Sequence, residues 1–169
     1  MTTAEHSKKV LGLTFRDELA PTDAALIREI VAATGKFTEA EVDVAVELVQ
    51  EYLARGPESG YWFTVAEHEG QVIGYAAYGL IPCTVASYDL YWIAVHPRLQ
   101  GSGIGRRILA EVEQRVRRVG GVRIYLDTSG RAAYDDTRAF YERTGYEKEA
   151  VLEDFYSPGD AKVIYLKRL

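Results

Sequence analysis

Residues 84–129 constrain the fold of this chain more than any other stretch. A β-type segment at 84–95 leads into a glycine-rich loop, a helical pattern over about 103–119 and a second β-type segment at 122–129. Strands joined by a helical crossover run parallel, whereas antiparallel neighbours need only a short turn. The stretch therefore predicts a mixed α/β sheet with one βαβ crossover. The positions expected to face inward on the helix are Ile104, Ile108, Leu109, Val112, Val116 and Val119.

The flanking segments predict further helices and mostly antiparallel strands. Residues 61–68 and 71–80 alternate around Glu69-Gly70, as in a hairpin, and 10–19 read as a strand. Helices are expected at 21–35, from a capping box at Thr38 and Glu41 onward, and at 136–145. Strands at 146–156 and 161–169 complete the order β-α-α-β-β-β-α-β-α-β-β. We expect one α/β (α+β) domain over 1–169, with six to seven strands, about four helices and a flexible tail at 1–9.

Composition narrows the class of protein. The net charge of −5 argues against a general nucleic-acid binder, which is usually basic. No run of about 18 apolar residues occurs and the start of the chain lacks a signal-peptide core, so we expect a cytoplasmic protein without a membrane partner. The single cysteine, Cys83, cannot form an intramolecular disulfide, and His6, His68 and His96 lack the spacing of metal ligands. No metal is expected.

The loop within "HPRLQGSGIGRRIL" (96–109) is suited to holding an anion. Glycines allow the backbone to approach a ligand closely, and the N–H groups and dipole of a helix start favour negative charge. A Walker A loop is excluded because Gly105 is followed by two arginines rather than by Lys and Ser/Thr. A dinucleotide fingerprint counted from Gly101 fails because its third glycine position is Arg106. A pyrophosphate cradle and a tight turn that binds nothing both stay open from these residues.

Two spaced motifs resemble those of the GNAT superfamily of N-acyltransferases. The pattern Gln100-x-x-Gly103-x-Gly105, preceded by "IAVHP", is similar to its acyl-CoA-binding motif. The segment "TRAFYERTGYEKE" (137–149) is similar to a later motif of the family, and the expected element order agrees along about the whole chain. The resemblance implies a GNAT-like fold, acetyl-CoA as cosubstrate and no metal.

The resemblance also implies where acetyl-CoA binds. The backbone at 93–95 would hydrogen-bond the pantetheine arm like an added strand, at the point where two strands of the family splay apart. The N–H groups of the loop would hold the pyrophosphate, and Arg106 could reach a phosphate. The residues assigned to the donor site are Ile93, Ala94, Val95, Gln100, Gly101, Ser102, Gly103, Ile104, Gly105 and Arg106.

Three residues are assigned to catalysis on the same basis. Tyr141 aligns with the tyrosine that protonates the CoA sulfur in many relatives, and an ordinary phenol is protonated at neutral pH. Asp89 and Asp127 lie on the strands before and after the glycine loop, where relatives carry a carboxylate base. Two extra residues separate Asp127 from the Tyr141 segment relative to the family pattern. The sequence leaves both carboxylates open.

The acceptor is the least determined part of the site. Aromatic side chains expected to line its pocket are Phe37, Tyr78, Tyr91 and Tyr156. The leading hypothesis is an N-acetyltransferase that acetylates a primary amine of a small molecule, amino acid or peptide by direct attack in a ternary complex. A non-catalytic CoA-binding sensor and a purely partner-binding domain are the alternatives. We expect a monomer or a homodimer.

Overall fold

The computed structural model describes residues 12–169, which form two compact units. The first comprises the described residues up to Tyr78 together with Trp92–Val112, and the second comprises Gly79–Tyr91 and Glu113–Leu169. The observed elements follow the order β-α-α-β-β-β-α-β-α-β-β, which confirms the sequence-based order. Short 3-10 turns at Gly56–Ser59, Pro97–Leu99 and Ala132–Tyr134 are additional. The tail expected at 1–9 lies outside the described residues.

In the first unit the neighbouring strands are β1 (Leu13–Arg16), β2 (Trp62–His68), β3 (Gln71–Leu80) and the end of β4 (Ser87–Val95). The hairpin between β2 and β3 turns at Glu69 and Gly70, which both have positive φ, as a two-residue hairpin turn requires. The helices are α1 (Asp23–Ala33), α2 (Glu39–Arg55) and the first half of α3 (Ile104–Arg118). The predicted capping box is confirmed, because Thr38 accepts from the Glu41 N–H and Glu41 accepts from the Thr38 N–H.

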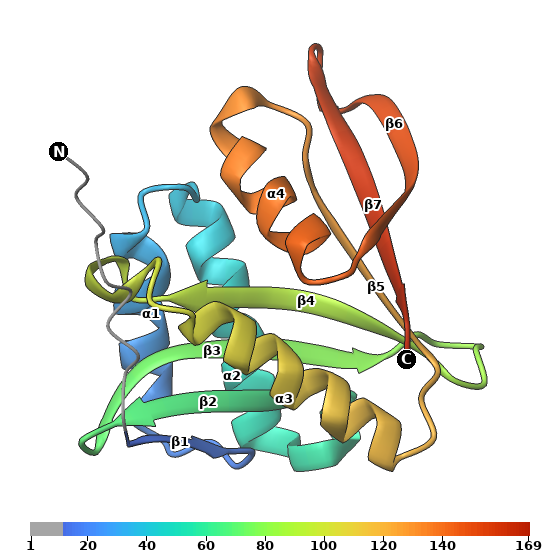
Figure 1. The fold of residues 1–169 in the computed structure, drawn as a ribbon. Coiled ribbons are helices and arrows are strands. Elements are labelled where there is room, and N and C mark those ends of the chain that lie inside the picture. The colour runs from blue at the N-terminus through green and yellow to red at the C-terminus, as the bar shows by residue number, and fades with distance from the viewer. Residues whose placement is uncertain (1–11) are drawn as a thin grey trace, which may run out of the picture. The chain divides into compact units, whose positions relative to one another are not determined.

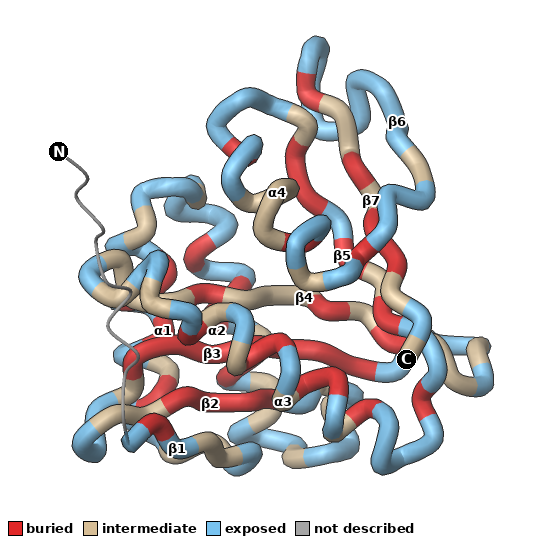
Figure 2. Tube along the Cα trace, in the orientation of Figure 1, coloured by how far each residue is buried: buried red, intermediate tan, exposed pale blue. Residues whose placement is uncertain are grey.

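The strands of this unit are covered on both faces. Figure 1 shows α1 and α2 on one side of β2 and β3 and α3 on the other. Phe63 of β2 contacts the ring of Tyr52 in α2, and most of β2 and β3 is buried (Figure 2). On the α3 side, a Cβ added to Gly74 would lie 3.0 Å from Ile108 Cδ1 and 2.9 Å from the Ala94 carbonyl oxygen. The absence of a side chain at Gly74 therefore lets α3 pack closely on the sheet.

In the second unit the strand order is β4-β5-β7-β6. The start of β4 pairs in parallel with β5 (Arg123–Ser129), which confirms the crossover predicted through the helix that is now α3. The neighbour of β5 on its other side is β7 (Asp160–Arg168), and β6 (Glu147–Ser157) pairs antiparallel with β7. A short helix, α4 (Asp135–Arg143), precedes this closing hairpin.

Some expected boundaries were wrong by a few residues. The strand beginning at 84 starts at Ser87, because Cys83 has positive φ and Thr84 turns back to hydrogen-bond the Ile81 carbonyl. The strand expected at 10–19 ends at Arg16, and residues 10 and 11 lie outside the described part. Val119, expected to face inward, is 69% exposed because α3 ends at Arg118. The other five apolar positions of that helix are buried.

Candidate functional site

The glycine loop at the start of α3 has the backbone geometry of an anion cradle. Gly101 and Gly103 have φ of +76° and +83°, a region that side chains rarely adopt, and a Cβ at either position would meet no atom within 4 Å. Ile104 is buried and begins the helix, so the loop is anchored at its end. The first N–H groups of an α-helix have no intrahelical acceptor. The loop therefore has open space beside Gly101 and Gly103, and the first N–H groups of α3 follow directly after them.

Side chains of the loop brace its backbone. Gln100 Nε2 donates to the Val95 carbonyl oxygen at 3.2 Å, and the Ser102 hydroxyl donates to the Leu99 carbonyl. Gly105 lies inside α3, and Arg106 is exposed in its first turn. The side chains of Gln100 and Ser102 thus shape the loop backbone through hydrogen bonds to carbonyl oxygens.

The pairing of β4 with β5 is short. It covers Ser87–Asp89 and Arg123–Tyr125, although β4 runs on to Val95 and β5 to Ser129. Ala94 is buried, whereas Ile93 and Val95 are half-buried. The last pair between β4 and β5 is at Asp89. If the two strands splay apart, as expected from the sequence, their pairing must end in this way.

Asp89 and Asp127 belong to one cluster in the second unit. Asp127 is two residues beyond Tyr125, the register partner of Asp89, so both carboxylates lie on the same face. Asp127 Oδ2 accepts a hydrogen bond from the Tyr156 hydroxyl at 2.8 Å and lies 3.3 Å from Lys162 Nζ. Partial burial raises the pKa of Asp89, the charge of Asp127 raises it further, and the Lys162 charge opposes the shift.

Tyr141 in α4 is buried within a group of aromatic rings. Its ring lies 5.3 Å from Phe140 and 6.0 Å from both Tyr146 and Tyr165, between ring centroids. Burial raises the pKa of the Tyr141 hydroxyl well above its ordinary value, and the charge of Asp127 adds to the shift. The phenol is therefore held in its protonated form, and Asp127 is electrostatically coupled to both other catalytic candidates.

The four acceptor-pocket candidates divide between the units. In the first unit, Phe37 packs against Trp92 with ring centroids 5.1 Å apart, and Tyr78 is buried. In the second unit, Tyr91 is half-buried, and Tyr156 is 47% exposed and donates its hydroxyl hydrogen to Asp127.

Sequence reasoning missed Trp92 and Lys162. Trp92 could have been noticed as an aromatic residue next to the segment at 93–95. Lys162 could not, because its proximity to Asp127 depends on the register of β5 and β7.

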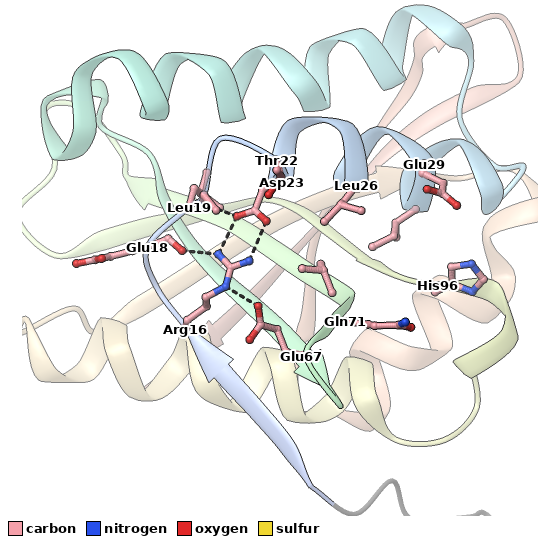
Figure 3. Close-up of a pocket in the computed structure, with 14 residues that line it drawn as sticks. Arg16, Glu18, Leu19, Thr22, Asp23, Leu26, Glu29, Glu67, Gln71 and His96 are labelled. Carbon is pink, nitrogen blue, oxygen red and sulfur yellow. Dashed lines mark hydrogen bonds and ion pairs between the residues drawn. The ribbon is translucent and has the colours of Figure 1, made fainter.

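A separate cavity of about 760 Å³ lies in the first unit, and none of the predicted site residues lines it. Figure 3 shows Arg16 at one end, bound by Asp23 at 2.7 and 2.8 Å and by Glu67 at 2.7 Å. Glu29, Gln71 and His96 lie at the other end (Figure 3). Because Asp23 is 1% exposed and also accepts the Ala20 N–H, this ion-pair network fixes the start of α1 on the sheet.

Residues 12–169 contain neither a candidate metal site nor a candidate membrane-spanning helix. No group of three or more His, Cys, Asp or Glu side chains is arranged to hold a metal ion in this part of the chain. None of its helices has the length and apolar character needed to cross a membrane.

Comparisons with known proteins agree with this geometry. The chain matches the model of the Acetyltransferase (GNAT) family over residues 26–146. A crystal structure of a GNAT-family protein from Desulfovibrio desulfuricans is 49% identical, covers 93% of this chain and 99% of its own, and superimposes with a TM-score of 0.91. The uncharacterized N-acetyltransferase YjgM of Escherichia coli is 27% identical over 150 residues, which cover 85% of this chain and 84% of that protein. The PaiA N-acetyltransferase of Thermoplasma acidophilum, solved with coenzyme A, shares the fold at 17% identity, with a TM-score of 0.73 and coverage of 94% and 100%.

Proposed function

This chain belongs to the Acetyltransferase (GNAT) family, and we propose that it transfers an acetyl group from acetyl-CoA to a primary amine by direct attack in a ternary complex. The acceptor is a small molecule, an amino acid or a peptide. The observation that carries the proposal is the coupling of Tyr141, Asp127 and Asp89 within one unit, where a protonated phenol accompanies a carboxylate of raised pKa. Such a pair supplies the acid and the base that amide formation from a thioester needs.

The glycine loop and the end of β4 are proposed to bind the donor. The open positive-φ backbone at Gly101 and Gly103 and the start of α3 fit a pyrophosphate, which several N–H groups can contact at once. Residues 93–95, beyond the last β4–β5 pair, are proposed to hydrogen-bond the pantetheine arm. These contacts place the thioester and allow the chain's own residues to handle the protons.

Asp89 is proposed as the base that removes a proton from the acceptor ammonium. Among the described residues its carboxylate makes no side-chain hydrogen bond or ion pair, whereas Asp127 is occupied by Tyr156 and Lys162. The raised pKa of Asp89 brings the carboxylate closer to the neutral range in which a general base works best. The negative charge of Asp127 then raises the pKa of Asp89 and makes its carboxylate a stronger base.

Tyr141 is proposed as the acid that protonates the departing thiolate. Its raised pKa keeps the hydroxyl protonated up to strongly alkaline pH. The rings of Phe140, Tyr146 and Tyr165 hold the side chain in one orientation, so that the proton is presented at a fixed place. Exclusion of water by the same rings limits competing hydrolysis.

Release of free thiol from acetyl-CoA tests the proposal. We expect release with at least one member of a panel of amino acids, polyamines, aminoglycosides and peptides, and a mass increase of one acetyl group on that amine. Tyr141→Phe should lower kcat by roughly 100-fold or more and leave acetyl-CoA affinity nearly unchanged. Tight CoA binding without thiol release from any amine would favour a non-catalytic sensor instead.

A pH–rate profile separates the two carboxylates. Asp89→Asn should remove the acidic limb of kcat/KM together with most of the activity. Asp127→Asn should leave a limb and move it to lower pH, because the charge that raises the pKa of Asp89 is gone. Loss of the limb in Asp127→Asn alone would reverse the assignment.

A further inference from the structure

Lys162 lies beside the carboxylate pair by virtue of strand register. Asp127 is directly opposite Ile164 in the β5–β7 ladder, so Lys162 is its diagonal neighbour on the same face, within reach of a long side chain. Its Nζ lies 3.3 Å from Asp127 Oδ2, and only 23% of the lysine side chain is exposed. The contact places a positive charge next to Asp127, and the same charge acts on Asp89 electrostatically.

Two residues in an irregular part of β6 contact Lys162 or its partner Asp127. The β6–β7 register shifts between Leu152 and Ser157, and Asp154 has a φ of +54° in the interval. Such irregularities re-aim side chains. Here the interval supplies the ring of Phe155, 4.8 Å from Lys162 Nζ, and the Tyr156 hydroxyl, 2.8 Å from the same Asp127 oxygen that faces the lysine.

We propose that Lys162 is a positioning residue of the reaction, whose ammonium, held between Asp127 and the Phe155 ring, fixes the Asp127 carboxylate and thereby sets the pH range in which Asp89 accepts a proton. The inference rests on the proposed function, since it requires Asp89 to be the base. Lys162 touches no reacting atom in this scheme and acts through the carboxylates.

Charged side chains on two neighbouring strands set the charge balance at Asp89. Asp127 on β5 opposes loss of the Asp89 proton, and Lys162 on β7 favours it. Tyr156 on β6 donates its hydroxyl hydrogen to Asp127, and the charge of Asp127 adds to the burial that raises the pKa of Tyr141 on α4. Lys162 is therefore the one cation that offsets the two carboxylates among the groups with a described interaction in this cluster.

The experiment compares Lys162→Met, Lys162→Arg and a matched control, Lys148→Met. Lys148 is an exposed lysine of β6, so its removal changes net charge equally without touching the cluster. Two readouts are needed: the acidic limb of kcat/KM, and the titration of the Asp89 carboxyl by ¹³C NMR in the substrate-free protein. The second readout does not depend on activity.

In Lys162→Met we expect both the rate limb and the Asp89 titration to move to higher pH by roughly half a unit or more, which lowers kcat/KM about 3-fold on the acidic side. Lys162→Arg should restore both, and Lys148→Met should change neither. An unchanged Asp89 titration in Lys162→Met would overturn the inference whichever group is the base. A shifted titration with an unshifted rate limb would instead refute Asp89 as the base, and with it the role of Lys162 in the reaction.

Discussion

Replacing Lys167 by methionine tests whether a buried ion pair ties α3 to β7 in the second unit. Lys167 Nζ lies 2.8 Å from both Oε1 and Oε2 of Glu113 and 2.8 Å from the Thr144 carbonyl oxygen at the end of α4. The two side chains are 21% and 9% exposed. Methionine keeps the unbranched apolar stem, so the change removes the charge and little volume.

The expected loss of stability follows from the Glu113 carboxylate, which Lys167→Met leaves without its partner. Without its partner, Glu113 is a nearly buried carboxylate, and breaking such a pair by removing one member costs about 3–5 kcal/mol. For a chain of this size about 2–4 °C of melting temperature corresponds to 1 kcal/mol, so Tm should fall by roughly 6–20 °C. Thermal unfolding followed by circular dichroism gives the shift directly, and urea unfolding gives the free energy.

Two further variants make the prediction specific. Arg168→Met removes the neighbouring cation, whose pair with Glu147 spans 3.4 Å between side chains that are 60% and 77% exposed. It should change stability by less than about 0.5 kcal/mol, because exposed pairs contribute little. Glu113→Leu combined with Lys167→Met should recover most of the loss, since no charge is then left unpaired. A loss below about 1 kcal/mol in Lys167→Met, or no recovery in the double variant, would refute the reasoning.

Three other predictions concern the loop, a helix start and alkaline pH. Gly103→Ala should raise the Kd for acetyl-CoA and cost only about 1–2 kcal/mol of stability, since its φ of +83° strains a side chain that has open space around it. Gly120→Ala, at a φ of +84° beyond the end of α3 and also with open space around it, should cost similar stability and leave the Kd unchanged; calorimetry of binding and of unfolding measures the two effects. Thr38→Ala should cost about 1 kcal/mol in urea unfolding through loss of the capping box. Burial and the hydrogen bond to Glu142 raise the pKa of Tyr165 to about 12, so the stability from this group is complete below about pH 10 and is lost as pH rises toward 12. Urea unfolding at several alkaline pH values should show this decline, and a slope that stays the same in Tyr165→Phe would contradict the assignment.

Local patterns were sufficient for most of the fold. The hairpin at Glu69-Gly70 and the capping box at Thr38 each depend on residues close together in sequence. Their outcome follows from backbone sterics and helix-end hydrogen bonding, which act over a few residues. The predictions that the strand begins at Thr84 and that Val119 faces inward were wrong. At both positions the apolar pattern of the sequence extends beyond the element, and the chain forms a turn instead.

The sequence by itself determined the family and the position of the glycine loop, because the spacing of Gln100, Gly103 and Gly105 is a local pattern that can be recognised without any distant contact. Only the tertiary structure decided how the carboxylates differ. In the sequence, Asp89 and Asp127 are both aspartates within predicted strands, and nothing local distinguishes them. Strand pairing brings Tyr156 and Lys162 to Asp127 and leaves Asp89 half-buried without such partners. The proton affinity of a carboxyl group depends on burial and on charges within a few ångströms, and those neighbours come from strands up to 73 positions away along the chain, as Lys162 is from Asp89.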